Sequence, residues 1–435
     1  MGGGLLQLVA YGAQDVYLTG NPEITFFKVV YRRHTNFAIE AIQQTFNGTA
    51  GFGNTVNVTI SRNGDLIHRT YLQVSLPALD RYQFGVNTTD RYVNYVGQKL
   101  LAQVSVEIGG QQIDKHYSDW LYIWNELSLP LGKKFGYERM VGADGDVVSS
   151  KSATVSETAR LNGDNTTLYI PLEFWFCRNV GLALPLIALQ YHEVKLKIQF
   201  EEMKKCIAAL DGTTALHADT IAQFASKSLD ATVWCDYIFL DTDERRRFAQ
   251  LSHEYLIEQL QFTGQETLAS SSGNRYRLNF NHPCKELIWV AKKSTNNPND
   301  WYNYTDDRTY EVAALTGPST SNLVNDVYPT GGNPFTRSLL QLNGNDRFAE
   351  RDGGYFNYVQ PYQHHTNIPK NRGINVYSFA LKPEELQPSG TLNMSRIDTA
   401  VLSMTSSVAG NVNIYAVNYN VLRIMSGMGG LAYSN

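Results

Sequence analysis

Cysteine is scarce in this 435-residue chain, and the four that occur exclude two kinds of protein. Cys177, Cys206, Cys235 and Cys284 form no CxxC pair, and no histidine pair at helical spacing accompanies them. This spacing does not fit a zinc site, and four cysteines are too few for a disulfide scaffold of this length. We therefore expect buried, inert thiols in a protein made in a reducing compartment.

Charge is also scarce, because charged residues make up only 18% of the chain and the formal net charge is −4. Proteins that neutralise nucleic-acid phosphates normally carry a basic excess, so we expect no direct contact with DNA or RNA. Two short basic clusters, at residues 204–205 and 245–247, are more typical of solvated or interface charges. The low charge indicates that neighbouring subunits or glycans cover much of the surface.

Targeting and membrane signals are missing as well. The N-terminus has no basic region, and Leu6 stands where a myristoylation site needs Ser or Thr. The longest weakly polar run, residues 180–189, is far shorter than the ~20 residues that cross a bilayer. We therefore expect a soluble chain.

Motifs that carry catalysis or cofactor binding are absent: there is no P-loop, dinucleotide fingerprint, HExxH or GxSxG. The carboxylate cluster at residues 241–244 lacks the Gly and distal Glu of an EF-hand loop, and the arginines that follow it favour a salt-bridged corner. Adjacent His364 and His365 would point to opposite faces of an extended chain. We therefore expect no enzyme, no cofactor and no metal.

Residues that favour strands are abundant, including 26 Tyr and 19 Phe. Residues 55–60 and 193–200 alternate between apolar and polar side chains, as half-buried strands do. Asn63-Gly64 predicts a β-hairpin, and residues 119–129 predict a short helix. Further strands are expected at residues 37–42, 71–76, 104–111, 168–176, 232–240, 255–262, 287–290, 376–381, 398–404, 412–417 and 421–424.

The length predicts two domains of roughly 200 residues, each with its own core. Two weak internal repeats support a duplication. Residues 61–65 resemble residues 342–346, and the order of strand, Pro/Gly-containing connection and strand at 169–198 recurs at 376–404. We predict two similar β-sandwiches in an all-β chain, with long surface loops at 132–165 and 292–336. The predicted boundaries are an N-terminal arm at 1–25, a first sandwich at 26–210, a linker at 211–224 and a second sandwich with a C-terminal tail at 225–435.

Several distinctive sequence blocks are spread along the chain. The first is QLVAYGAQDVYLTGNP at residues 7–22 with TFFK after it, and the last is NYNVLRIMSGMGGLAY at residues 418–433. Further matching blocks lie at residues 107–114, 181–194, 236–241 and 253–258. Together they span nearly the whole chain, and they resemble the major capsid proteins of large nucleocytoplasmic DNA viruses, and within them the chlorella-virus (phycodnavirus) group.

The resemblance implies a fold and an assembly. The fold would be a double jelly roll, two tandem eight-stranded antiparallel sandwiches with short helices in loops. Three copies would form a pseudo-hexagonal capsomer that tiles an icosahedral shell over an internal membrane, assembled in the host cytoplasm. The implied partners are neighbouring capsomers and minor capsid proteins, with the membrane involved only indirectly. The Gly-rich segments at 1–4 and 427–430 are candidates for flexible contacts under the capsomer.

The resemblance also implies glycans, attached by viral enzymes to asparagines on exposed loops outside the usual sequon. The family's glycan positions do not carry over, because the loop at 405–411 is short and the loop at 292–336 is this chain's own. The candidate positions here are Asn303, which does lie in an N-x-Thr sequon, Asn333 and Asn411. Two alternatives stay open: a minor capsid paralogue of the same fold, and a carbohydrate-binding sandwich. The aromatic stretch at 301–304 motivates the second alternative, but no facing pair of carboxylates supports sugar cleavage.

Overall fold

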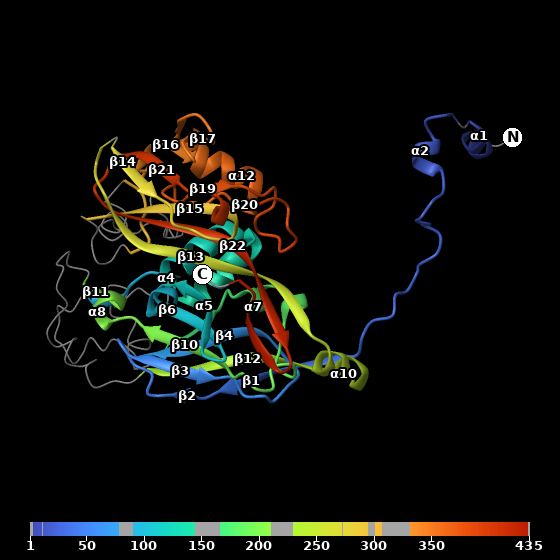
Figure 1. The fold of residues 1–435 in the computed structure, drawn as a ribbon, viewed down its shortest axis with the longest axis horizontal. Coiled ribbons are helices and arrows are strands. Elements are labelled where there is room, and N and C mark those ends of the chain that lie inside the picture. The colour runs from blue at the N-terminus through green and yellow to red at the C-terminus, as the bar shows by residue number, and fades with distance from the viewer. Residues whose placement is uncertain are drawn as a thin grey trace, which may run out of the picture. The chain divides into compact units, whose positions relative to one another are not determined.

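The computed structural model describes residues 3–10, 12–77, 90–143, 166–209, 229–271, 273–294, 301–306 and 331–433. The chain divides into two compact units, residues 1–37 and residues 38–435. The first unit contains helices α1 (Gly3–Val9) and α2 (Val16–Thr19). The second unit contains the strands labelled in Figure 1, starting with β1 (Phe37–Gln44), which begins at the end of the first unit.

Two facing sheets form the first sandwich. One sheet has the order β1, β12 (Asp230–Leu240), β4 (Leu66–Leu76), β8 (Thr166–Pro171). The other has the order β3 (Thr55–Thr59), β10 (Val194–Phe200), β6 (Leu101–Ile108), β7 (Gln111–Tyr117). Numbered from one to eight along the chain, these strands give the orders 1-8-3-6 and 2-7-4-5. Short strands extend the sheets at β2 (Phe46–Asn47) and β9 (Leu184–Pro185), and β5 (Asp90–Tyr92) pairs with β11 (Ile207–Ala209).

The second sandwich repeats this topology. One sheet has the order β13 (His253–Leu268), β22 (Gly410–Met425), β15 (Pro283–Lys293), β19 (Asn375–Ser378). The other has the order β14 (Asn274–Arg277), β21 (Ala400–Ser406), β16 (Phe335–Leu342), β17 (Asn345–Asp346). The orders are again 1-8-3-6 and 2-7-4-5, so the predicted pair of eight-stranded antiparallel jelly rolls is confirmed. Short strands β18 (Arg351–Asp352), β20 (Leu392–Asn393) and β23 (Met428–Leu431) complete the sheets.

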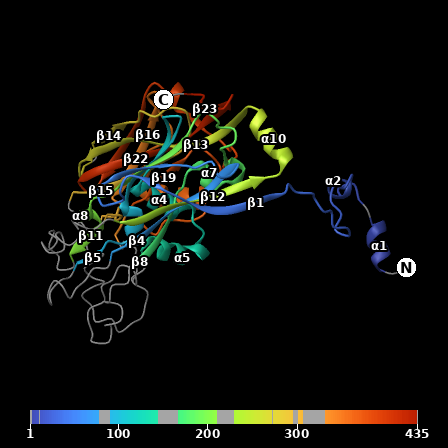
Figure 2. The same cartoon turned by 90° about the horizontal axis from the view of Figure 1, so that it is seen from below.

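Apolar alternation places the core between the sheets, as the sequence predicts. In β10 every second side chain is buried, and Leu196 lies opposite Val58 of β3 on one side and Val106 of β6 on the other. The long strands β13 and β22 run side by side through the second sandwich, as Figures 1 and 2 show. Each sandwich has its own hydrophobic cluster, and a third cluster lies between them.

The strand at residues 230–240 corrects the predicted domain boundary. β12 was expected to open the second sandwich, but it pairs with β4, from Asp230 opposite Ser75 to Ile238 opposite Leu66. It is the eighth strand of the first jelly roll, so the assignment of residues 230–240 to the second half is wrong. Along the chain, the boundary between the two sandwiches lies instead at helix α10 (Thr242–Gln250), which connects β12 to the first strand of the second sandwich. The predicted linker, 211–224, lies outside the described residues.

Local expectations also needed correction. Asn63-Gly64 does not close a hairpin, because β3 and β4 lie in different sheets. The predicted loop at 132–165 begins with helix α5 (Leu131–Val141), and the predicted strand at 168–176 ends in helix α7 (Trp175–Arg178). The helix expected at 119–129 is confirmed as α4 (Ser118–Ser128).

The remaining helices are short: α3 (Val96–Leu100), η1 (Val180–Leu182), α8 (Met203–Cys206), η2 (Tyr355–Val359), α12 (Gln360–His364) and η3 (Met394–Arg396). Within the described ranges, no helix combines the length and apolar character that crossing a membrane requires.

Candidate functional site: the junction of the two sandwiches

Helix α4 joins the two sandwiches through an aromatic cluster. Ten of its eleven residues are buried, although the helix belongs to the first half. Trp120 packs at 5.7 Å from Tyr415 of β22, and Tyr122 stacks at 4.6 Å on Tyr302, centroid to centroid. A helix with so many buried residues is covered on more than one side, and the second sandwich supplies part of that cover. Aromatic pairs of this kind each add about 0.5–1.5 kcal/mol beyond the area that they bury.

A partly buried ion pair lies at the start of the same helix. Asp119 Oδ2 lies 2.5 Å from Lys292 Nζ of β15, and the Tyr304 hydroxyl donates to Asp119 Oδ1 at 3.0 Å. Burial alone would raise the pKa of Asp119, but the ammonium groups of Lys292 and Lys99 hold it below its usual value. The carboxylate is therefore ionised at neutral pH and links the two sandwiches electrostatically.

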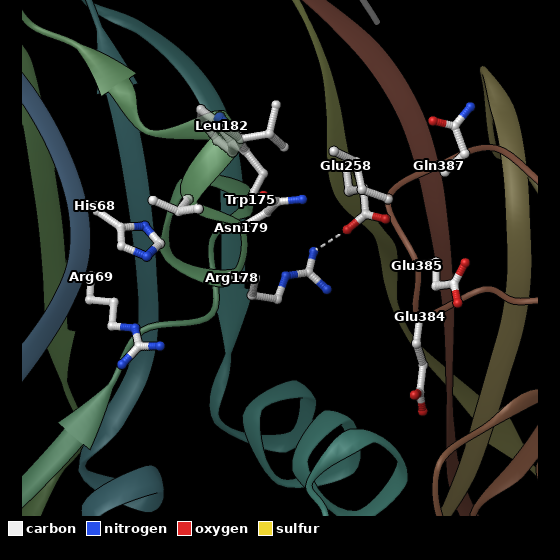
Figure 3. Close-up of a pocket in the computed structure, with 12 residues that line it drawn as sticks. His68, Arg69, Trp175, Arg178, Asn179, Leu182, Glu258, Glu384, Glu385 and Gln387 are labelled. Carbon is white, nitrogen blue, oxygen red and sulfur yellow. Dashed lines mark hydrogen bonds and ion pairs between the residues drawn. The ribbon is translucent and has the colours of Figure 1, made fainter. Parts of the chain in front are cut away.

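A second charged group crosses the junction at a cleft of about 660 Å³. Arg178 of α7 reaches across this cleft to Glu258 of β13, with Nη2 and Oε2 2.6 Å apart, as Figure 3 shows. Lys285 of β15 contacts the other oxygen of Glu258. The Arg178 guanidinium also lies 4.6 Å from the ring centre of Trp124, so it contacts both halves.

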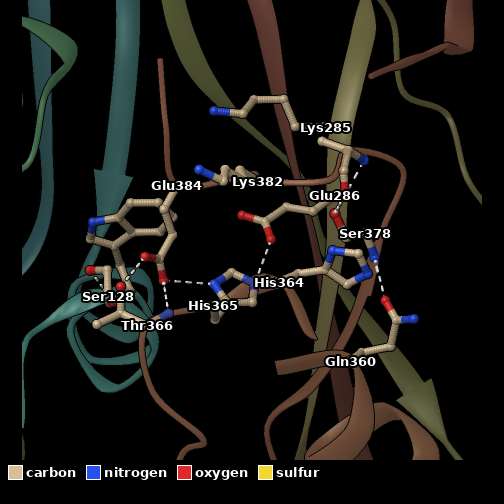
Figure 4. Close-up of polar contacts among 12 residues, drawn as sticks. Ser128, Lys285, Glu286, Gln360, His364, His365, Thr366, Ser378, Lys382 and Glu384 are labelled. Atoms are coloured by element: carbon tan, nitrogen blue, oxygen red, sulfur yellow. Dashed lines mark hydrogen bonds and ion pairs between the residues drawn. The ribbon is translucent and has the colours of Figure 1, made fainter. Parts of the chain in front are cut away.

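A histidine between two carboxylates fixes the loop that follows β19. His365 Nε2 lies 2.8 Å from Glu286 Oε2, and His365 Nδ1 lies 2.9 Å from Glu384 Oε1, as Figure 4 shows. Burial disfavours the charged ring, but the two carboxylates outweigh this and raise the pKa of His365 to about 9. The two adjacent histidines therefore have different partners. His365 forms ion pairs with two carboxylates, and His364 contacts the Leu381 carbonyl.

The C-terminal strand docks onto the first sandwich, which corrects the expectation of a flexible tail. The Tyr191 N–H donates to the Gly427 carbonyl at 2.9 Å, and the Gly429 N–H donates to His192 Nδ1 at 3.1 Å. A Cβ at Gly429 would lie only 2.6 Å from Leu189 Cδ2. The glycines at 427–430 therefore permit close packing and do not provide freedom.

These contacts make the junction a structural site. The thiols of Cys206 and Cys235 are buried, and burial raises the pKa of each to about 12, so they stay protonated. Cys177 and Cys284 are also buried and free, as the sequence predicts. No cluster of His, Cys, Asp or Glu suited to a metal ion occurs among the residues described. The contacts at the junction therefore hold the two sandwiches in a fixed position relative to each other.

The three candidate glycan positions differ in their surroundings. Asn303 is 1% exposed, and its side-chain oxygen accepts from both the N–H and the hydroxyl of Thr305. Asn333 forms a reciprocal amide pair with Asn375. Asn411 is exposed near the start of β22. Its exposure therefore favours Asn411 over Asn303 and Asn333, whose side-chain amides are engaged in hydrogen bonds.

The other predicted sites have structural roles. The carboxylate cluster caps and flanks α10: Asp241 accepts from the Thr242 N–H, and Glu244 pairs with Arg247 at 3.5 Å. Arg245 pairs with Asp65 at 2.9 Å, so the predicted salt-bridged corner is confirmed. In the aromatic stretch at 301–304, Tyr302 and Tyr304 are buried in the junction and cannot stack on a sugar.

Three further histidines also make structural contacts. His116 lies 3.0 Å from Asp114 and stacks on Phe174, and His253 Nε2 lies 2.9 Å from the Phe248 carbonyl. The backbone N–H of His282 donates to the Ser395 hydroxyl at 2.8 Å. The predicted surface loop at 292–336 is described only in part, because its residues 295–300 and 307–330 lie outside the described ranges.

Two family profiles match the chain. "Major capsid protein N-terminus" matches residues 25–241, and "Large eukaryotic DNA virus major capsid protein" matches residues 244–430. The interval between the two matches falls at the start of α10, where the structure also passes from the first sandwich to the second.

Full-length relatives match as well. The major capsid protein of Pyramimonas orientalis virus is 50% identical over 461 residues, and that of Paramecium bursaria Chlorella virus 1 is 47% identical over 473 residues. Both comparisons cover 100% of this chain and 100% of the relative. A solved structure described as "PBCV-1 virus capsid, quasi-atomic model" superposes with a TM-score of 0.75 at 40% identity, covering 94% of this chain and 100% of that chain.

Proposed function

This chain belongs to the major capsid proteins of large eukaryotic DNA viruses, and on that premise we propose that three copies form the ring that tiles the viral shell. As a capsid protein it is a structural component of the virion. The proposal concerns the unit of assembly: a homotrimer with a pseudo-hexagonal outline in an icosahedral shell.

The repeated topology of the two sandwiches carries the proposal. Both have the strand orders 1-8-3-6 and 2-7-4-5, so one chain presents two similar modules side by side. Three chains then supply six modules, and a ring with threefold symmetry approximates a hexagon that fills a flat facet. A closed ring needs a heterologous contact, in which different surfaces of neighbouring copies meet.

The junction supports the same proposal, because a tile must keep its shape. If the two modules moved independently, the six-sided outline would be lost. The aromatic cluster around α4 and the ion pairs Asp119–Lys292 and Arg178–Glu258 resist such motion. Permanent protein–protein interfaces usually bury more than about 2,000 Å², so we expect contacts of this size between the copies.

Other parts of the proposal follow from family membership. We infer a role in assembly and not in catalysis, with neighbouring capsomers and minor capsid proteins as partners and the host cytoplasm as the place of assembly. The match to major capsid proteins over the full length favours a major over a minor component. We propose Asn411 as the first position to examine for a glycan.

Light scattering after size-exclusion chromatography tests the proposed assembly. The expected mass of the purified full-length chain is three times that of one chain, and it stays at this value on dilution. A single species with the mass of one chain at high concentration would contradict the proposal.

A further inference from the structure

An uncovered stretch of strand-forming sequence runs from the N-terminal unit into the first sandwich. Residues 24–31 read ITFFKVVY, a composition that favours β-strands. Residues 21–36 nevertheless form neither a helix nor a strand in this chain. Phe26, Phe27 and Tyr31 are 90%, 97% and 89% exposed.

The exposure continues into β1, which is an edge strand. β1 stands at the end of the order β1, β12, β4, β8, so only one of its edges is paired among the described strands. Its first five residues are all exposed, including Phe37 and Ile39, so neither face of this end is covered. A long apolar edge of this kind invites another strand to pair with it.

The amount of apolar surface shows that this region needs a partner. Residues 6–39 hold 14 of the 29 large apolar side chains that are exposed in the described part of the chain. Monomeric proteins rarely leave such a concentration open to water, and contiguous apolar surface usually marks an interaction site.

Charge indicates what the partner is. Residues 24–36 carry Lys28, Arg32 and Arg33 and no acidic side chain. Residues 1–37 hold three basic and two acidic side chains, which leaves 34 basic and 39 acidic on residues 38–435, a net charge of −5. The segment is therefore complementary in sign to the body of another copy of the same chain.

We propose that residues 24–31 of one copy add as a strand to the free edge of β1 in the next copy of the ring. Main-chain hydrogen bonds would supply the affinity, and the apolar side chains of the segment would cover the exposed end of β1. Because every copy gives one segment and receives one, the exchange closes in a trimer. This inference rests on the proposed trimer and adds the element that interlocks its subunits.

Hydrogen exchange of the assembled full-length protein tests the inference. In the trimer, we expect the backbone amides of residues 24–31 and 37–41 to exchange their hydrogens more slowly than those of an unstructured chain. The double variant Phe26→Asp/Val30→Asp places two carboxylates in the added strand, so it should lose the slowed exchange in both segments. The matched control is Leu6→Asp/Leu8→Asp in α1, where the side chains are similarly exposed; it should keep the slowed exchange.

Cross-linking of the wild-type chain gives a second readout that does not depend on a variant folding. Normal and heavy-isotope chains are co-assembled and treated with an amine-reactive reagent. Cross-links from Lys28 should join a normal chain to a heavy one. Cross-links only within one isotope form would overturn the inference, as would slowed exchange that appears only after anionic vesicles or an oligonucleotide are added. If the protein is a trimer but the amides of residues 24–31 show fast hydrogen exchange, this inference alone is contradicted. If the wild-type protein is a monomer, the proposed function is contradicted as well.

Discussion

The carboxylate of Asp119 in α4 lies 2.5 Å from the ammonium of Lys292 in β15, so one ion pair ties the first sandwich to the second. The two residues are 173 positions apart in the chain. Their contact exists only when both sandwiches are folded and docked. It therefore reports directly on whether the junction is a rigid link.

Removing this carboxylate should destabilise the whole chain. Asp119→Asn leaves the Lys292 ammonium, whose side chain is 20% exposed, without its counter-ion. We expect the free energy of unfolding to fall by about 1–3 kcal/mol, less than for a fully buried pair because water still reaches the lysine. Chemical denaturation measures this loss. The control is Glu193→Gln, which breaks the exposed Lys195–Glu193 pair and should cost less than about 1 kcal/mol. Equal losses in the two variants would show that the junction pair has no special role.

Truncating the aromatic cluster should loosen the two sandwiches from each other. Tyr122 is 2% exposed and stacks on Tyr302, so Tyr122→Ala leaves a cavity between the halves. We expect a loss of about 3 kcal/mol or more, and unfolding in two steps where the wild type unfolds in one. Tyr362→Ala removes a side chain that is 76% exposed and should change stability by no more than about 0.5 kcal/mol. Calorimetry distinguishes the two variants; a single unchanged transition in Tyr122→Ala would argue against coupling through α4.

Stability should fall at alkaline pH because of His365. The flanking carboxylates raise its folded-state pKa to about 9, above the ~6.5 of an unfolded chain. The stabilisation is therefore complete below about pH 6.5 and is lost as the pH rises through about 9. It amounts to about 3 kcal/mol at most, from 1.36 kcal/mol per pKa unit.

The measurement compares unfolding at about pH 7 and about pH 10. The wild type should lose more stability over this interval than His365→Gln, which has no titrating ring at this position. His364→Gln is the matched control, because His364 contacts a backbone carbonyl and no carboxylate among the contacts described. Its pH dependence should follow the wild type, and parallel curves for all three proteins would refute the assignment.

The docked C-terminal strand predicts a contrast between neighbouring glycines. A side chain at Gly429 would meet Leu189 and Ile108 of the first sandwich, so Gly429→Val should cost about 1–3 kcal/mol through overpacking. At Gly430 an added Cβ would lie 3.3 Å from the end of the Gln111 side chain, which can move. Gly430→Val should therefore cost less. Thermal unfolding ranks the two variants, and the reverse order would mean that the tail is not held on the first sandwich.

The sequence predicted most of the fold because its information is local. Alternation in 193–200 located β10, and the repeated pattern at 169–198 and 376–404 does join equivalent strands, the sixth and seventh of each jelly roll. The other internal repeat, between residues 61–65 and 342–346, does not join equivalent connections. Residues 61–65 connect strands in different sheets, whereas Asn343 and Gly344 have positive φ and close the hairpin between β16 and β17. An Asn-Gly pair indicates backbone freedom, not which strands pair.

The junction could not be predicted in the same way. Asp119 and Lys292 are 173 residues apart, and Arg178 and Glu258 are 80 apart, so no local spacing connects either pair. One signal was present in α4, whose sequence SDWLYIWNELS is apolar or aromatic on more than one side. Such a helix is covered on all sides, and this composition could have indicated a contact with the second half.

Electron microscopy of the purified protein tests the central claim most directly. Class averages of single particles should show a ring of three copies with six lobes of two alternating kinds and a fixed spacing between the lobes of each copy. Isolated two-lobed particles whose lobes vary in their separation and angle would contradict both the rigid junction and the six-sided tile.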